Sequence, residues 1–318
     1  MSIKVGVVGC GSWGRNHARV YRELPGVELV GVADIDPAVA REVGERYRVP
    51  YYTDPDKILS DPEVQLVSIC TPTITHAELG LRALEGGKHV LVEKPMANSV
   101  AEALDLIRAA ERHHQWLTVG FVERFNPAVR EAYSNVTEGD IGDVILAHSR
   151  RVSRSPGRIG DVGVVKDLAI HDIDIVNHLM GVMPESVSAV TGRIRHRYED
   201  YANINMLYVD DRNAFVEVNW LTPRRVRALT VTGTEGIIYV EYSTQQITIE
   251  NDEMIMQPFL AYREPLMEEL GSFVGHVLDD VEPEVTGVDG LNALRVCEAA
   301  LKSSATKKRV NLGDGWNT

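Results

Sequence analysis

The chain has 318 residues, of which 44% are hydrophobic and 25% charged, a composition typical of a globular protein with room for two domains. Its formal charge of −13 argues against nucleic acid or an anionic membrane as the main partner, since both select a basic face. Three widely spaced cysteines predict neither a disulfide framework nor a zinc site, and no apolar run approaches a membrane span. We therefore expect a cytoplasmic protein without export leader that acts on a small molecule.

Short apolar runs alternate with segments of helical period through the first part of the chain. The runs lie at 3–8, 27–34, 64–72, 89–95 and 116–121. Continuous apolar strands that alternate with amphipathic helices predict a parallel sheet covered on both faces. The fold class expected for residues 1–122 is therefore a doubly wound α/β domain.

A glycine motif follows the first of these runs. In "GCGSWG", Gly9, Gly11 and Gly14 form G-x-G-x-x-G at a strand-to-helix turn, where a helix N-terminus offers free N–H groups to a pyrophosphate. The alternative is a tight turn without a ligand, which this position disfavours. Asp34 ends the second run, where an acid accepts hydrogen bonds from the adenosine ribose and favours NAD over NADP.

Two further strand ends carry polar residues. "ICTPTITH" places Thr71 and Pro72 after one strand, and "VEKP" places Glu93 and Lys94 after the next. Ligands gather at the carboxyl ends of parallel strands. A lysine before proline is held extended there, although it could also neutralise Glu93 or reach water.

The segment "KDLAIHDIDIVNH", residues 166–178, has an unusual polar stripe. At 100° per residue, Asp167, His171, Asp174 and His178 share one face of an otherwise apolar helix. Unpaired charge is costly in such a place, so the stripe requires a function or partners. Three readings stay open: a catalytic group facing a cleft, a metal site, and a satisfied polar network between domains.

Residues 186–250 read as successive short strands without intervening helices, which predicts an antiparallel sheet. Residues 264–280 and 287–304 then return to helical period. We expect a Rossmann domain over 1–122 and a second, α+β domain over 123–318.

Three stretches closely resemble the Gfo/Idh/MocA family of NAD(P)-dependent sugar oxidoreductases: "GCGSWG", "TPTITHAELGLRALEGGKHVLVEKP" and "DLAIHDIDIVNHLMG". The resemblance implies an NAD-binding Rossmann domain and a second domain with a large, mostly antiparallel sheet that binds substrate and forms a homodimer or homotetramer. It implies no metal. The cofactor-binding residues implied are Gly9, Gly11, Ser12, Trp13, Gly14, Asp34, Thr71, Pro72, His76, Glu93 and Lys94.

The same resemblance implies a catalytic set of Lys94, Asp167 and His171. His171 would take the proton of a sugar hydroxyl while hydride leaves to the nicotinamide, because the imidazole pKa lies near neutral pH. Lys94 would stabilise the developing alkoxide, and Asp167 would orient one of the two.

Two other stretches, "GFVERFNPAV" and "SRRVSRSPGRIGDVGVVKD", resemble UDP-N-acetylglucosamine 3-dehydrogenases within the family. Guanidinium groups suit a diphosphate, although a solvated basic loop or edge strand is the alternative for each arginine. The substrate-binding residues implied are Arg124, Asn126, Arg150, Arg151, Arg154 and Arg158.

Two other functions compete with a nucleotide-sugar 3-dehydrogenase. One is a polyol or aldose dehydrogenase such as myo-inositol 2-dehydrogenase, for which four guanidinium groups have no evident use. The other is a non-catalytic NAD-sensing regulator, which the presence of Lys94, Asp167 and His171 disfavours.

Overall fold

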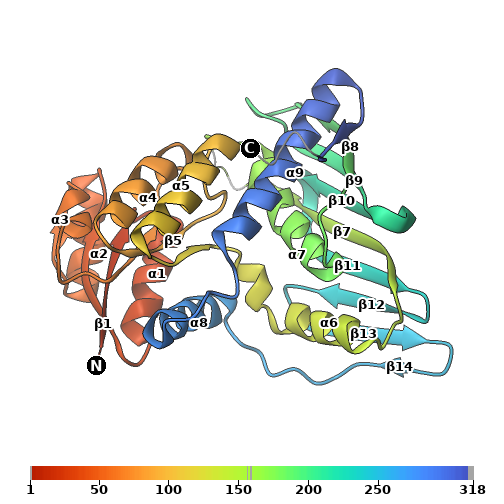
Figure 1. The fold of residues 1–318 in the computed structure, drawn as a ribbon, viewed down its shortest axis with the longest axis horizontal. Helices are drawn as coiled ribbons and strands as arrows, with labels where there is room; N and C mark the ends of the chain where they lie inside the picture. Colours follow the sequence, from red (N-terminus) through yellow and green to blue (C-terminus); the bar gives the residue numbers. More distant parts are fainter. Residues whose placement is uncertain (1, 156, 158–159, 314–318) are drawn as a thin grey trace. The chain divides into compact units, whose positions relative to one another are not determined.

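The computed structural model describes residues 2–155, 157 and 160–313, which fall into two compact units (Figure 1). Unit 1 comprises residues 1–122 and 266–291, and unit 2 comprises residues 123–265 and 292–318. Among the described residues, no helix is both long enough and apolar enough to cross a membrane.

Unit 1 is built on a six-stranded sheet with the strand order β3-β2-β1-β4-β5-β6, in which every described pair is parallel. Its strands are β1 (Ile3–Val8), β2 (Val27–Ala33), β3 (Tyr51–Tyr52), β4 (Leu66–Ile69), β5 (His89–Val92) and β6 (Leu117–Val119). The helices between them are α1 (Ser12–Glu23), α2 (Pro37–Tyr47), α3 (Asp56–Leu59), α4 (His76–Glu85) and α5 (Val100–His113). The predicted Rossmann fold is confirmed.

Local sequence explains where these helices begin. Asp36 caps α2 by accepting from the N–H groups of Ala38 and Val39, with Pro37 at the first helical position. Asp34 is therefore not needed as a cap. Ser99 caps α5 by accepting from the N–H of Glu102.

The helix α8 (Pro265–Asp279) departs from the expected division of the chain. We expected residues 123–318 to form one domain, but residues 266–291 cluster with unit 1. The reason is apolar burial: the core that holds Ile3 and Val5 also buries Leu266, Leu270 and Phe273 of α8.

Unit 2 is built on a nine-stranded sheet with the strand order β14-β13-β12-β11-β7-β10-β9-β8-β15. The strands are β7 (Val144–Arg154), β8 (Ser186–Gly192), β9 (Tyr201–Leu207), β10 (Asn213–Asn219), β11 (Leu221–Gly233), β12 (Gly236–Glu241), β13 (Gln246–Asn251), β14 (Ile255–Met256) and β15 (Val310–Asn311). The β7–β10 pair is parallel and the other described pairs are antiparallel, which confirms the predicted sheet.

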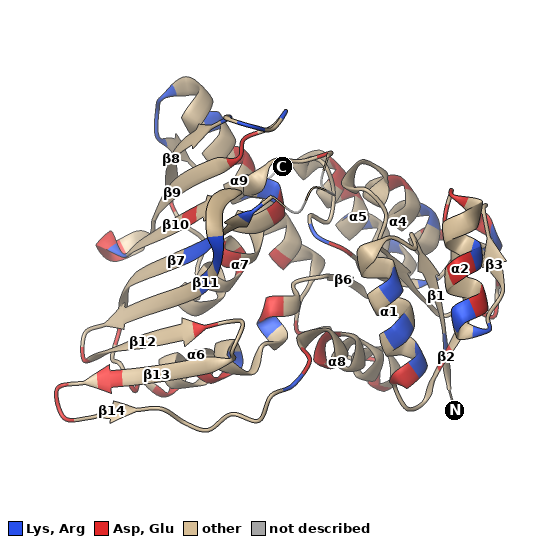
Figure 2. Ribbon diagram, turned by 180° about the vertical axis from the view of Figure 1, so that it is seen from behind, with Lys and Arg blue, Asp and Glu red and all other residues tan. Residues whose placement is uncertain are grey.

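Three helices accompany this sheet: α6 (Pro127–Glu138), α7 (Ile170–Met180) and most of α9 (Gly287–Thr306). Figures 1 and 2 show α6 and α7 running along one face of the sheet. β7 carries three of the predicted substrate arginines and pairs with β10 on one side and β11 on the other. The possibility that these arginines lie on a loop or an edge strand is therefore wrong, because β7 is an interior strand.

Candidate active site

The glycine loop of unit 1 has the geometry that a pyrophosphate requires. Gly9 adopts φ +90°, and a Cβ at this position would lie 2.6 Å from the carbonyl carbon of Cys70. A Cβ at Gly14 would collide with the Gly9 carbonyl oxygen. Gly11, by contrast, has open space where a Cβ would project, and it precedes α1, which has no side-chain cap. Free N–H groups beside open space fit a dinucleotide phosphate.

Asp34 holds this loop against the end of β2. Its Oδ2 accepts from the N–H of Cys10 at 2.7 Å, and its Oδ1 accepts from the N–H of Asp36 at 2.9 Å. Each carboxylate oxygen has two lone pairs, so Asp34 retains capacity for the ribose hydroxyls of NAD. Nearby, Ser12 is exposed, whereas Trp13 packs partly against the core of unit 1.

The ends of β4 and β5 are joined through His76. Its Nδ1 lies 2.8 Å from the carbonyl oxygen of Pro95, and its Nε2 lies 2.7 Å from that of Thr71. The side chain of Thr71 accepts from the hydroxyl of Thr75. Because His76 is only 1% exposed, this geometry makes it a brace between two strand ends rather than the direct cofactor ligand we expected.

Glu93 has a similar internal position behind Lys94. Its Oε1 lies 3.2 Å from His17 Nε2, and its Oε2 accepts from the N–H of Lys94 at 3.2 Å. The Glu93 side chain therefore shapes the turn that carries Lys94. Lys94 is itself half-buried, and Pro72 at the neighbouring strand end is exposed.

In unit 2, the predicted polar stripe begins in a π-helical turn (η3, Val165–Ala169) that leads into α7. The uniform 100° spacing assumed from the sequence therefore does not hold for Asp167. Wide turns of this kind often occur at functional sites. Asp167 and His171 each retain 8% exposure, so both lie at the margin of the buried region.

Glu199 supports the start of this turn. Its backbone carbonyl accepts from the N–H of Val164 at 2.9 Å, and its Oε1 accepts from the N–H of Val165 at 3.2 Å. Burial raises the pKa of the Glu199 carboxyl. The first residues of the turn before Asp167 are thus held from outside the helix.

The remaining two residues of the stripe have structural partners within unit 2. Arg124 donates to both carboxylate oxygens of Asp174, at 2.7 and 2.8 Å, and His178 stacks on Tyr133 with ring centroids 3.9 Å apart. This agrees with a satisfied polar network, although its partners come from the same unit. No group of three or more potential metal ligands occurs among the described residues.

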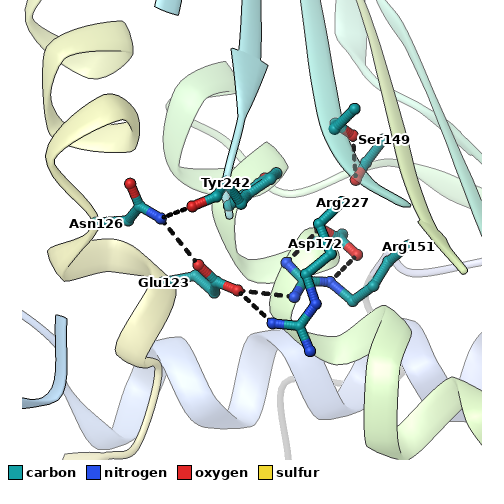
Figure 3. Close-up of polar contacts among 8 residues, drawn as sticks. Glu123, Asn126, Ser149, Arg151, Asp172, Arg227 and Tyr242 are labelled. Atoms are coloured by element: carbon teal, nitrogen blue, oxygen red, sulfur yellow. Dashed lines mark hydrogen bonds and ion pairs between the residues drawn. The ribbon is translucent and has the colours of Figure 1, made fainter. Parts of the chain in front are cut away.

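Figure 3 shows a second polar cluster, which is more deeply buried than the stripe. It includes Asp172, the residue that follows His171 in the chain. Arg151 donates to both oxygens of Asp172, at 2.8 and 3.0 Å, and to Oε1 of Glu123 at 2.8 Å. Arg227 donates to the same Glu123 oxygen at 3.2 Å. Burial opposes ionisation of Glu123, but the charges of Arg151 and Arg227 outweigh it and lower the pKa of this carboxyl.

These contacts correct the predicted substrate-binding set. Arg151 is 2% exposed and its guanidinium is engaged by two carboxylates, so it does not fit a diphosphate ligand. Arg124 is engaged by Asp174. Asn126 is a buried helix cap whose Nδ2 donates to the Tyr242 carbonyl oxygen at 3.0 Å.

The other predicted arginines differ among themselves. Arg150 is exposed and pairs with Glu217 at 2.9 Å, Arg154 is exposed at the end of β7, and Arg158 lies outside the described residues. Sequence reasoning missed Glu123, Asp172 and Arg227. The available signal was Asp172 itself, an acid within an apolar helix that required a buried cation.

Two family models match the chain: one for the Gfo/Idh/MocA oxidoreductase family with an NAD-binding Rossmann fold over residues 3–121, and one for the Gfo/Idh/MocA C-terminal domain over residues 129–239. The scyllo-inositol 2-dehydrogenase (NAD(+)) of Bacillus subtilis is 31% identical over 322 residues, covering 95% of this chain and 94% of the relative.

The UDP-N-acetylglucosamine 3-dehydrogenase of Acidithiobacillus ferrooxidans is 34% identical over 188 residues, or 59% of this chain and 58% of the relative. A solved structure of that enzyme superposes with a TM-score of 0.89 at 26% identity and covers 97% of this chain and 100% of its own. Together with the glycine loop and the two sheets, these similarities identify the chain as a member of the Gfo/Idh/MocA family of NAD-binding oxidoreductases.

Proposed function

We propose that this protein oxidises a secondary hydroxyl of a sugar or polyol, with His171 as general base and NAD⁺ as hydride acceptor. The observation that carries the proposal is the placement of Asp167 and His171. Both lie at the margin of the buried region, on the helical segment of η3 and α7, which Glu199 holds at its start and Arg151 holds through Asp172. Lys94 belongs to unit 1, so its joining of the site is part of the proposal.

The reaction divides into a proton transfer and a hydride transfer. The hydroxyl proton passes to the imidazole of His171, and the Lys94 ammonium stabilises the negative charge that develops on the oxygen. Asp167 orients one of these groups. Bound NAD⁺ supplies the hydride acceptor, so the alcohol becomes a ketone and the carbon loses one hydride.

UDP-N-acetylglucosamine, oxidised at its 3-hydroxyl, is the first substrate we propose. It is supported by the similarity to the A. ferrooxidans enzyme and by the exposed Arg154 at the end of β7. An inositol is the second candidate, since the B. subtilis inositol dehydrogenase aligns over nearly the whole chain.

The test is NAD⁺ reduction by the purified protein with UDP-N-acetylglucosamine, free N-acetylglucosamine or myo-inositol, in the presence of a trap for the keto product. Reduction with the UDP-sugar alone is expected. Reduction with myo-inositol alone would keep the reaction and discard the nucleotide sugar. Full NADH binding without turnover of any sugar or polyol would instead favour an NAD-sensing regulator.

We further infer that the protein works in the cytoplasm as a homodimer or homotetramer. The inference rests on the family resemblance and on the acidic composition without paired cysteines. Light scattering at micromolar concentration measures the oligomeric state, and a monomer would contradict it.

A further inference from the structure

The pairing of β7 with β11 is interrupted by a bulge. Arg154 pairs with Leu221, and Val152 pairs with Val226, so four residues of β11 stand opposite the single residue Ser153. We call residues 222–225 the β11 bulge. It contains Pro223, which has no N–H to donate to the ladder. Bulges re-aim side chains and are frequent next to active sites.

The β11 bulge is held by hydrogen bonds to one amide side chain. Asn219 Oδ1 accepts from the N–H of Leu221 at 3.0 Å and from the N–H and hydroxyl of Thr222 at 2.9 and 2.8 Å. The next residue, Trp220, donates its N–H to the carbonyl oxygen of Asp200 at 2.9 Å. The chain entering the bulge is therefore fixed before any ligand arrives.

The residues that hold the β11 bulge are connected to residues that hold η3 and α7, the helical segment of Asp167 and His171 in unit 2. Asp200 follows Glu199, which holds the start of the turn that carries Asp167. On the other side of the bulge, Arg227 contacts Glu123, which in turn contacts Arg151 (Figure 3). The β11 bulge is thus tied at both ends to the elements that position Asp167 and His171.

The charges around the bulge do not balance. Glu123 and Asp172 are matched by Arg151 and Arg227, which leaves no carboxylate of that cluster for further arginines. Burial, together with the nearby charges of Arg151 and Arg225, lowers the pKa of Arg227 to about 10. The leading cause is burial of the Arg227 guanidinium, and the positive charges of Arg151 and Arg225 add to it.

Three exposed arginines border this region: Arg154 at the end of β7, and Arg224 and Arg225 in the bulge. Within the described part of the chain, none of the three forms an ion pair with a carboxylate. Some arginines elsewhere do, as Arg41 and Arg82 show.

We propose that Arg224 and Arg225 of the β11 bulge, with Arg154, form an anion site that binds the phosphate or diphosphate group of the substrate. Guanidinium forks offer bidentate hydrogen bonds to phosphate oxygens, and the bulge carries two of them on adjacent residues, next to the segment that Asn219 holds. The inference rests on the proposed function, because it assigns the anionic part of the molecule whose hydroxyl His171 deprotonates. It selects a phosphorylated or nucleotide-linked sugar over a neutral cyclitol.

The experiment titrates the full-length protein, saturated with NADH, with UDP, glucose 1-phosphate and uridine by calorimetry at low salt. The test variant is R224Q/R225Q. The control is R41Q/R108Q, which removes the same charge from exposed helix positions in unit 1. We expect UDP to bind wild type and the control alike and to bind the test variant at least about tenfold more weakly. Thermal melting and NADH affinity check that the variant is folded.

The comparison of UDP with uridine separates binding of the diphosphate from binding of the nucleoside. Uridine is expected to bind weakly and with equal affinity to all three proteins. Glucose 1-phosphate binding comparable to UDP would assign the site to a sugar phosphate, and a marked preference for UDP to a nucleotide sugar. Equal UDP affinity in wild type and R224Q/R225Q would overturn the proposal, as would wild type that binds UDP no better than uridine. Turnover of myo-inositol with no UDP binding would reject the anion site alone, whereas arginine-dependent UDP binding without oxidation of any sugar would reject the dehydrogenase alone.

Discussion

The two candidate regions, the glycine loop of unit 1 and helix α7 of unit 2, are built in different ways. The glycine loop is shaped by backbone: a positive φ at Gly9, close approach at Gly14, and Asp34 accepting from the N–H of Cys10. Helix α7 is held by side chains that are distant in sequence, such as Arg151 with Asp172. A loop shaped by its backbone needs glycines at fixed spacing, which can be recognised in the sequence as a motif. A cluster of buried side chains is formed by residues far apart in the sequence, which show no common pattern.

The largest effect is expected on turnover, in a variant whose NADH affinity should stay unchanged. His171→Ala should lower turnover by about 10²–10⁴, the range for loss of a general base, because the substitution removes the imidazole from unit 2 alone. NADH affinity, measured by fluorescence titration, should stay near the wild-type value because the glycine loop belongs to unit 1. Wild-type turnover in this variant would remove His171 from the mechanism.

Breaking the buried cluster should cost stability. Asp172→Asn removes one of two carboxylates that surround the Arg151 guanidinium, and loss of a buried partner costs about 3–5 kcal/mol of unfolding free energy. Glu217→Gln is the matched control, since its pair with Arg150 is partly exposed and is worth about 0–1 kcal/mol. Urea denaturation followed by circular dichroism compares them, and equal midpoints would show that the cluster does not stabilise unit 2.

Two glycine substitutions test whether the backbone of the glycine loop in unit 1 binds the cofactor. Gly11→Ala places a methyl group in open space next to the expected pyrophosphate, so NADH affinity should fall about tenfold while the melting temperature holds. Gly14→Ala should lower both, since its Cβ meets the Gly9 carbonyl oxygen. Unchanged NADH affinity in both variants would place the cofactor elsewhere.

The pH dependence of stability should differ between two buried glutamates. In unit 1, Glu269 is 2% exposed, and neither of its carboxylate oxygens has a hydrogen-bond partner among the described residues. Burial and nearby Glu93 raise the pKa of Glu269 well above its ordinary value. Above pH about 4.5 the unfolded chain ionises this group while the folded protein keeps it protonated, so Glu269 makes stability fall as pH rises toward the raised pKa. The lowered pKa of Glu123 has the opposite sign: its contribution is present above pH about 4.5 and is lost as pH falls through the folded-state pKa.

Glu269→Gln should therefore gain stability over wild type by up to about 1.4 kcal/mol per pH unit above pH 5, until the raised pKa is reached. Melting temperatures at pH 5, 6 and 7 measure the difference between the two proteins. A constant difference across this range would show that Glu269 ionises normally in the folded state.

The sequence predicted what local patterns encode. Strand periods, the glycine loop, the Asp36 cap and the alternation of strands and helices all depend on neighbours within a few residues, and the structure has them. The π-helical turn at Asp167 was not predictable from spacing, because it depends on contacts from Glu199. Arg124 and Arg151 were assigned to substrate because the sequence does not reveal Asp174 and Asp172 as their partners.

The return of residues 266–291 to unit 1 has a consequence for synthesis of the protein. A nascent chain that has emerged only to Val122 lacks α8, so the apolar surface around Ile3 and Val5 stays without its cover until more than a hundred further residues have been translated. The Rossmann unit is thus completed late, and a fragment ending at residue 122 should bind the hydrophobic dye ANS more strongly than the whole protein. Ribosome-bound chains of increasing length, probed by limited proteolysis, should gain protection of β1 after α8 has left the exit tunnel.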